Sequence, residues 1–484
     1  MLSPLFKQSW VVLGVLLNML GQGMLVGYTS VLLPPLQAPG AEIKVDIYSA
    51  SIIASMIGAV GMFGFFTSAI LMDLCGRKFV HGLVAVPGIV GWLCIYYADS
   101  VTLLIVGRAF GGFAAGATVS LGAIVIGEYT SPKNRGMFLN LKTAAVCLGN
   151  LVVHVLGHFY QWRTVAVLSV WPLAASLLNV CTWPESPAWL VSKSKYKESE
   201  KSFYWLNGRN EESVNEIENL LTAQKERMAN DFKNVSFGGK LVQILKKFTR
   251  KDFLKPVMII FFACICLEAC GRHVFPAFAS QIIGEVTGSK SHKFYYTLGI
   301  DSIITASAIF SSVLVKLMKR RTLLFATGFL SLIVLYCICG YMYLVSVDIL
   351  SSERTYIPMV LFVVYFILSN LGCTPIPMAL LGEIFPLAHR GVGSSVAGFI
   401  FSMCVTLAMK VTPYLLVHIK VHGTFAFFGT ILGLSLAVLW FILPETKDRT
   451  LQEIEDYIYN GEFKQIVDKE ANVTMIPPQK NYDV

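Results

Sequence analysis

The chain has 484 residues, of which 55% are hydrophobic, 14% are charged and 12% are aromatic, and its mean hydropathy is +0.62. An ordinary soluble domain carries about 25% charged residues, so this composition excludes a soluble enzyme of two or three domains. A bilayer-spanning helix needs about 20 mostly apolar residues. The composition therefore predicts an all-α membrane protein with many spans.

Twelve apolar runs with few charges follow one another along the chain, six before and six after a long polar segment. The first six cover residues 9–33, 49–71, 80–97, 102–127, 137–157 and 164–183. The second six cover residues 256–279, 295–315, 322–345, 356–381, 393–417 and 423–443. We therefore expect 12 transmembrane helices.

The polar segment 184–255 contains apolar residues at helical spacing over residues 210–227. This pattern predicts an amphipathic helix in a small cytoplasmic subdomain, and a flexible linker is the alternative. The domains expected are an N-terminal bundle over 1–183, a linker subdomain over 184–255, a C-terminal bundle over 256–443 and a cytoplasmic tail over 444–484.

The net charge of +9 comes from basic residues that collect in particular loops. With both termini in the cytoplasm, 30 of the 39 Lys and Arg fall on the cytoplasmic side, Lys142 being counted there, and six fall outside. The remaining three, Arg108, Arg272 and Lys410, fall within spans. Cytoplasmic loops of membrane proteins are rich in Lys and Arg, so the pattern predicts this orientation and argues against a nucleic-acid partner.

The 11 cysteines lie mostly in apolar runs and are odd in number, which is not typical of a disulfide framework. Cys266, Cys270 and His273 are close enough on one predicted helix to hold a metal ion. Because cysteine is also a common small apolar core residue, we expect no metal site and no cofactor.

Short motifs recur in the two halves. The pattern G-E-x6-R-G runs over residues 127–136 and again over 382–391, and a P-E-[S/T] triplet begins at residues 184 and 444. A basic cluster at 76–78 returns in weaker form at 319–321. Ordered recurrence predicts two homologous six-helix bundles. Such repeats are typical of transporters in which one half rocks against the other around a central site.

The recurring charges lie at the expected cytoplasmic ends of helices. We expect pairs such as Glu128 with Arg135, and Glu383 with Arg390, to break and form as a gate moves; static helix caps are the alternative. The full set of expected gating residues is Asp73, Arg77, Lys78, Glu128, Arg135, Glu185, Arg320, Glu383, Arg390 and Glu445.

These motifs together resemble the sugar porter family of the major facilitator superfamily. The resemblance rests on D-L-C-G-R-K at 73–78, E-Y-T-S-P-K-N-R-G at 128–136, P-E-S-P-A-W-L at 184–190, G-E-I-F-P-L-A-H-R-G at 382–391, and P-E-T-K with R-T-L-Q-E-I at 444–454. Within this family, T-A-A at 143–145, L-G-N-L at 148–151, Y-Q-W-R at 160–163 and Lys410 resemble the insect facilitated trehalose transporters. The resemblance implies the major facilitator fold and transport without chemistry on the substrate.

The resemblance also implies positions for the sugar pocket, and most of them are substituted. A glutamine of helix 5 falls at Thr143, the polar pattern of helix 7 falls at Leu267, Glu268, Gly271 and His273, an asparagine of helix 8 falls at Ile304, and a glutamate of helix 10 falls at Asn370. The family's tryptophan after two prolines is replaced by Met378, and its Asn-Trp pair in helix 11 is replaced by Phe401 and Ser402. The helix 1 aspartate of proton-coupled members is replaced by Thr29. The expected substrate-binding residues are Thr143, Glu268, His273, Asn370, Met378 and Thr29.

Ionisable side chains inside spans are candidates for function. Glu268 and Arg272 are spaced for an ion pair on one helix, and the alternative is that Glu268 faces the cavity and accepts substrate hydroxyls or a proton. His154 and Lys410 are expected to be structural, and Pro375 and Pro377 to break helix 10.

The main hypothesis is facilitated diffusion of a hexose or of a disaccharide such as trehalose across the plasma membrane. The alternatives are a porter of a non-sugar metabolite with the same fold, a proton-coupled sugar symporter and a sugar sensor that does not transport. The expected partners are a small sugar and the lipid bilayer, and the sequence does not indicate an oligomeric state. No nucleophile and base with suitable spacing indicate an enzyme.

Overall fold

A computed structural model describes residues 3–209, 214, 217, 251–287, 293–350, 356–384 and 390–447. Helices dominate this part of the chain, and 12 of them are long and apolar enough to cross a membrane. They overlap all 12 predicted spans, which confirms the expected all-α membrane fold. The amphipathic helix predicted over 210–227 lies almost wholly outside the described residues, as does the tail beyond 447.

The first half of the chain supplies six spans, the last of which is built from two short helices. They are α1 (Pro4–Gln37), α2 (Ile47–Cys75), α3 (Arg77–Tyr96), α4 (Val101–Tyr129), α5 (Pro132–Phe159), α6 (Trp162–Leu168) and α7 (Trp171–Val180). Side chains cap several N-termini: Asp46 accepts a hydrogen bond from the Ser49 N–H and so satisfies a backbone donor at the start of α2.

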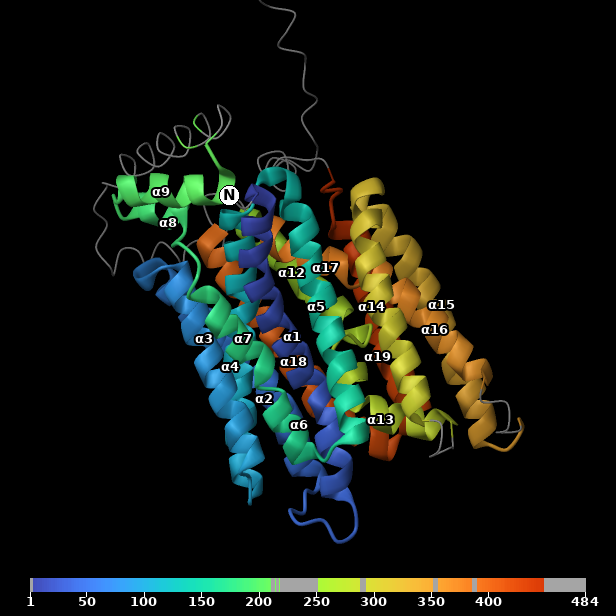
Figure 1. Cartoon of the computed structure of the whole chain (residues 1–484). Coiled ribbons are helices and arrows are strands. Elements are labelled where there is room, and N and C mark those ends of the chain that lie inside the picture. The colour runs from blue at the N-terminus through green and yellow to red at the C-terminus, as the bar shows by residue number, and fades with distance from the viewer. Residues whose placement is uncertain are drawn as a thin grey trace, which may run out of the picture.

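Two short helices, α8 (Pro187–Ser192) and α9 (Tyr196–Asn207), follow the sixth span and lie across one end of the first half (Figure 1). The second half contains α12 (Lys251–Ala269), α13 (Val274–Thr287), α14 (Lys293–Leu317), α15 (Arg320–Ser346), α16 (Tyr356–Leu371), α17 (Pro375–Glu383), α18 (Arg390–His418) and α19 (Lys420–Ile442).

Two spans of the second half are interrupted. The first break separates α12 from α13 at Gly271, whose φ of +83° is open to glycine and disfavoured for other residues. The second separates α16 from α17 immediately before Pro375, which confirms the break predicted from the two prolines. Non-helical backbone at membrane depth is tolerated where it is buried in protein or lines a cavity. Both breaks are therefore expected to lie in the protein interior or at a cavity.

Glycines allow helices to approach closely within the first half. A Cβ atom on Gly116 of α4 would overlap the carbonyl group of Gly61 on α2, and one on Gly112 would lie 2.7 Å from the Met56 carbonyl oxygen. Small residues at this spacing therefore allow α4 to pack closely against α2.

In the described part of the chain, the two halves meet mainly through three pairs of helices: α1 with α13, α2 with α18, and α5 with α14. We call the end of the bundle that carries residues 73–78, 128–135, α8 and α9 the motif end, which is uppermost in Figure 1. The other end, near the loop 38–46, is called the opposite end. The two ends differ in their contacts, as described below.

Candidate substrate cavity and gates

A cavity of about 1070 Å³ lies between the two halves and extends to the motif end. Its walls come from α2, α4 and α5 in the first half and mainly from α14, α17 and α18 in the second, with Arg320 of α15 and Asn370 of α16. Asp73, with a side chain that is 83% exposed, borders it at the motif end, whereas the buried residues Asn370 and Phe401 border it at depth. Small-molecule pockets have volumes of about 300–1,000 Å³, so this one has room for a disaccharide.

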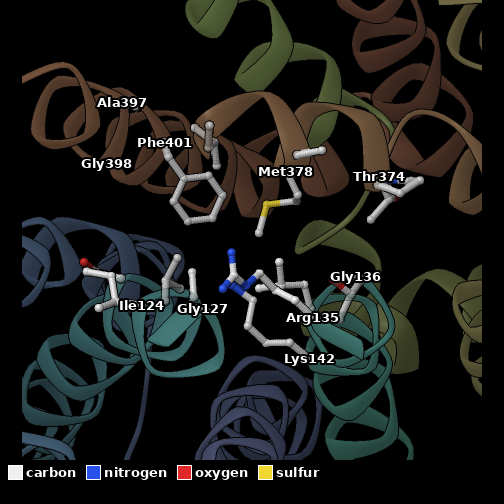
Figure 2. A pocket seen from close by; sticks show the side chains of 18 of the residues that line it. Ile124, Gly127, Arg135, Gly136, Lys142, Thr374, Met378, Ala397, Gly398 and Phe401 are labelled. Carbon is white, nitrogen blue, oxygen red and sulfur yellow. The ribbon is translucent and has the colours of Figure 1, made fainter. Parts of the chain in front are cut away.

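Three of the six predicted substrate-binding residues line this cavity: Thr143 from α5, Asn370 from α16 and Met378 from α17. The Asn370 side-chain amide donates to the Phe366 carbonyl oxygen at 2.8 Å. Figure 2 shows Met378 facing Arg135 and Lys142 across the cavity. Polar side chains from both halves therefore face the same cavity. Few of them are amides of the kind that bind sugar hydroxyls.

Glu268 and His273 do not line this cavity in the described part of the chain. The His273 ring Nδ1 lies 2.8 Å from one Glu268 carboxylate oxygen, and both side chains are buried. The His273 ring also contacts the ring of Phe401, with centroids 5.9 Å apart, and Phe401 is a cavity residue. The Glu268–His273 pair therefore lies behind Phe401, outside the surface of the cavity.

The ion pair expected between Glu268 and Arg272 is wrong. Helical spacing fails because α12 ends at Ala269 and the chain turns at Gly271, which directs Arg272 away from Glu268. The guanidinium group of Arg272 instead donates to the Cys147 thiol sulfur on α5 at 3.0 Å, a contact between the two halves.

Thr29 lies inside the first half. Its hydroxyl oxygen accepts a hydrogen bond of 2.6 Å from the Arg108 guanidinium group, and both residues have no exposed surface. Arg108 also donates to the carbonyl oxygens of Leu25 at 2.7 Å and Ile53 at 3.3 Å. These neutral acceptors join α4 to α1 and α2, so the described contacts of Thr29 are with the helix core.

The cysteines considered as metal ligands make other contacts. The Cys270 thiol donates to the Leu267 carbonyl oxygen at 3.0 Å, and the His273 Nδ1 is occupied by Glu268. Among the described residues, no three His, Cys, Asp or Glu side chains come close enough together to hold a metal ion.

At the motif end of the first half, charged residues form one connected network. Arg77 makes two hydrogen bonds of 2.8 Å to the Glu128 carboxylate, which also accepts from the Ser186 hydroxyl at 2.5 Å. The Glu185 carboxylate accepts from the backbone N–H groups of Arg77 at 2.8 Å and Lys78 at 3.1 Å. It therefore caps α3, where a carboxylate also interacts favourably with the helix dipole.

Further contacts extend this network. Lys78 donates to the carbonyl oxygens of Trp183 at 2.6 Å and Cys181 at 3.2 Å, and Asp73 lies 3.7 Å from Arg77. The expected pair of Glu128 with Arg135 is not formed in this structure, where the Glu128 carboxylate binds Arg77 instead. Arg135 is exposed and lines the cavity.

The second half repeats the capping arrangement. The Glu445 carboxylate accepts from the N–H groups of Arg320 at 3.0 Å and Arg321 at 3.1 Å, as Glu185 does at α3. The Arg321 guanidinium group donates to the Leu443 carbonyl oxygen at 2.8 Å, as Lys78 does to Trp183. The side chains of Glu383 and Arg390 lie outside the described residues. The described motif contacts all join residues of one half.

At the opposite end, contacts cross between the halves. The His154 Nδ1 on α5 lies 2.5 Å from an Asp301 carboxylate oxygen on α14, and its Nε2 lies 3.0 Å from the Pro276 carbonyl oxygen on α13. One turn along α5, the ring of His158 stacks on that of Phe294 with centroids 3.8 Å apart. Ser30 with Ser280 at 3.2 Å, and Ser51 with the Lys410 carbonyl oxygen at 2.6 Å, also join the two halves.

Sequence reasoning missed the roles of two charged residues in spans. Asp301 is the partner of His154, and an acid inside the predicted span 295–315 was the signal that could have found it. Lys142 was assigned to a cytoplasmic loop, but it lies within the helical span Asn134–Phe159 and lines the cavity. That assignment is wrong, because residue 142 falls inside both the predicted span 137–157 and α5, which begins at Pro132.

Twelve spans in two packed halves, a cavity between them and contacts across one end define a polytopic membrane carrier. A family model described as "Sugar (and other) transporter" matches residues 24–457, and the chain belongs to this family. It is therefore a multi-pass membrane transporter and not an enzyme.

Individual relatives agree with this assignment. The chain is 28% identical over 416 residues to the facilitated trehalose transporter Tret1 of Apis mellifera ligustica, covering 86% of this chain and 80% of that one. It is 27% identical over 454 residues to Tret1 of Polypedilum vanderplanki, covering 93% of this chain and 88% of the relative.

Solved structures show the fold. The inward open conformation of the xylose transporter XylE from E. coli matches with a TM-score of 0.73 and 16% identity, over 94% of this chain and 99% of that one. The proton:xylose symporter XylE bound to 6-bromo-6-deoxy-D-glucose matches with a TM-score of 0.72 and 19% identity, over 93% and 99%. The expected major facilitator fold is confirmed.

Proposed function

We propose that this chain is a facilitative transporter of a small sugar, a hexose or a disaccharide such as trehalose, that works by alternating access. One observation carries the proposal: a cavity large enough for such a solute opens at the motif end, while contacts between the halves close the opposite end. A second arrangement, with the motif end closed and the opposite end open, would complete the cycle. The similarity to facilitated trehalose transporters, such as those of Apis mellifera ligustica and Polypedilum vanderplanki, supports the substrate class.

The orientation proposed places the motif end in the cytoplasm and the protein in the plasma membrane. The motif end carries Arg77, Lys78, Arg135, Arg320 and Arg321, whereas basic residues are sparse at the opposite end. Excess Lys and Arg in loops favours the cytoplasmic side. The structure would then correspond to a state whose cavity faces the cytoplasm.

Within this cycle, Thr143, Asn370 and Met378 are proposed to contact the sugar, because they line the cavity from both halves. Glu268 and His273 lie one layer behind it and are proposed to position Phe401. The capped networks around Glu185 and Glu445 are proposed to keep the helix ends of each half rigid while the halves rock.

Uptake into proteoliposomes tests the proposal. Labelled trehalose, glucose and a panel of polyols are offered to the purified protein, and saturable uptake of at least one sugar down its gradient is expected. Binding without uptake of any of them would contradict the proposal and favour a sugar sensor. Saturable uptake of non-sugars alone would favour a porter of another metabolite.

One observation keeps proton coupling as a second candidate: a buried carboxylate, Glu268, is paired with a histidine next to the cavity wall. Uptake is therefore compared at about pH 5.5 and about pH 7.5, with and without a proton gradient. Facilitated diffusion predicts that the gradient has no effect. A strong dependence on the gradient, lost in Glu268→Gln, would establish symport instead.

A further inference from the structure

The cavity wall contains a lysine at membrane depth. Lys142 lies on α5 in the span Asn134–Phe159, and its stem passes Gly122 on α4, where an added Cβ atom would lie 3.5 Å from the lysine Cδ. A charged side chain within a span is expensive and is a candidate for function by default. The position therefore requires an explanation that helix packing does not supply.

Neither Lys142 nor its neighbour Arg135 has an acidic partner among the described residues. The acids in the same wall are Asp73 and Glu128, and both lie against Arg77. Residues 135 and 142 are two helical turns apart and share a face of α5, and Figure 2 shows both side chains extending into the cavity. The first half thus brings uncompensated positive charge to the substrate space.

A further basic side chain, Arg272, lies next to the deep end of the cavity. Arg272 lines a small space that shares Asn370 and Thr374 with the main cavity, and its described hydrogen bond is to the sulfur of Cys147, a weak acceptor. Asn150 borders the same small space, and its side-chain oxygen is buried without a hydrogen bond. Polar groups at this depth are therefore incompletely satisfied by the protein itself.

A neutral sugar leaves the Lys142 ammonium group without a counter-charge, whereas a carboxylate supplies one. Hydrogen bonds between charged groups are about twice as strong as those between neutral groups. The hydroxyl and amide groups of Thr143, Ser311, Asn370 and Thr374 remain in the wall to meet the hydroxyls of the same solute. The chemistry of the wall fits a molecule with both features.

We propose that the cavity selects a sugar-sized hydroxylated monocarboxylate, such as a uronate or an aldonate, and that the Lys142 ammonium group binds its carboxylate. This inference rests on the proposed transport role and narrows its substrate class. A single ammonium group in the deep wall matches a single negative charge, and Arg135 at the wider motif end attracts the same anion as it enters.

The test compares uptake of labelled glucuronate and labelled trehalose into proteoliposomes by the unmodified protein, Lys142→Gln and Lys410→Gln. Lys410 is the matched control, because it is a lysine within a span whose side chain is exposed and does not line the cavity in the described structure. A potential set by K⁺ and valinomycin, positive inside, is applied in a second series. Only a transported anion gains driving force from it.

The proposal predicts saturable glucuronate uptake that the positive potential accelerates. Lys142→Gln is expected to lower the preference for glucuronate over trehalose by about tenfold or more, the effect of losing one charge-assisted hydrogen bond, and Lys410→Gln to leave the ratio unchanged. Trehalose uptake with no uptake of glucuronate and no competition by it would overturn this inference and leave the sugar transport proposal intact. Absence of uptake of both would overturn both, and equal loss of both activities in Lys142→Gln would overturn selection by Lys142.

Discussion

The two ends of the molecule are held together in different ways. At the motif end, the described charged contacts join residues of the same half, as Arg77 with Glu128 and Glu445 with the N-terminus of α15. At the opposite end, several contacts cross from one half to the other, as His154 with Asp301 and Ser30 with Ser280. Contacts within a half make that half rigid, whereas contacts between halves determine which end is open.

This difference separates two kinds of substitution. Changes at the motif end should weaken the fold of one half, and changes at the opposite end should shift the equilibrium between conformations. An end that is either open or closed has two states, and a few side-chain contacts across it can shift the balance between them. The predictions below test that separation, from the largest expected effect to the smallest.

The Arg77–Glu128 pair should give the largest loss of stability. Its side chains are only 13% and 19% exposed, so Glu128→Ala leaves a largely buried guanidinium group and the Ser186 hydroxyl without their acceptor. We expect a loss of roughly 2–4 kcal/mol of unfolding free energy, somewhat below the value for a fully buried pair. Thermal unfolding in detergent, followed by tryptophan fluorescence, measures it.

The control for this change is Glu198→Ala on α9, which breaks an ion pair with Lys195 whose side chains are more than half exposed. Exposed pairs contribute about 0–1 kcal/mol, so this variant should unfold close to the unmodified protein. Equal destabilisation by both variants would show that the motif network does not hold the first half together.

The His154–Asp301 pair should control the opening of the opposite end. Asp301→Asn keeps the shape of the side chain but removes its charge, and should favour opening by about 1–3 kcal/mol, or about 5- to 150-fold in the equilibrium. A cysteine introduced at Ser280, which faces Ser30 across the halves, reports the opening through its reaction with an impermeant maleimide.

The control for Asp301→Asn is Ser302→Ala at the neighbouring position, because the Ser302 hydroxyl donates to Leu298 within α14 itself. The labelling rate should rise in Asp301→Asn and stay unchanged in Ser302→Ala. An unchanged labelling rate in both variants would show that the His154–Asp301 pair does not control the opening of this end.

Gly58 should show how closely the halves must approach. A Cβ atom there would lie 2.5 Å from the Thr406 hydroxyl oxygen and 2.6 Å from its backbone nitrogen on α18. Overpacking costs about 1–3 kcal/mol, so Gly58→Ala should lower both the unfolding temperature and the uptake rate. Gly340→Ala is the matched change, since nothing described lies within 4 Å of an added Cβ there, and it should be neutral.

The smallest effect is expected at the rim of the opposite end. Glu42 pairs with Arg163 at 2.6 Å, but its side chain is 69% exposed. Glu42→Gln should change the unfolding free energy by at most about 1 kcal/mol, and less in high salt. Unfolding measured at low and high ionic strength checks this, and a larger, salt-independent loss would show that this loop helps to hold the first half together.

The sequence predicted the spans, the repeat and the family because each depends on a long or recurring pattern. Apolar runs of membrane length are unambiguous, and residues such as Glu185 and Glu445 recur at equivalent positions with equivalent capping contacts. The break before Pro375 was also predictable, because proline lacks the backbone donor that a continuous helix needs.

The side-chain partners were less predictable, because they depend on tertiary placement. Glu268 and Arg272 have the spacing of a helical pair, but the turn at Gly271 directs Glu268 to His273 instead. Glu128 has Arg135 nearby in sequence, but its carboxylate pairs with Arg77, which lies far away in the sequence. His154 and Asp301 are far apart in sequence, and no local pattern joins them.

The central claim is that the two ends open and close in alternation around the cavity. Spin-label distances test it most directly, with one pair at Leu74 and Leu317 near the motif end and another at Tyr160 and Tyr295 near the opposite end, all exposed positions on different halves. The exposed cysteines Cys75, Cys181 and Cys337 are first replaced by serine. Addition of a transported sugar should populate shorter distances at the motif end together with longer ones at the opposite end. Changes of the same sign at both ends, or none in a protein that transports, would contradict the account.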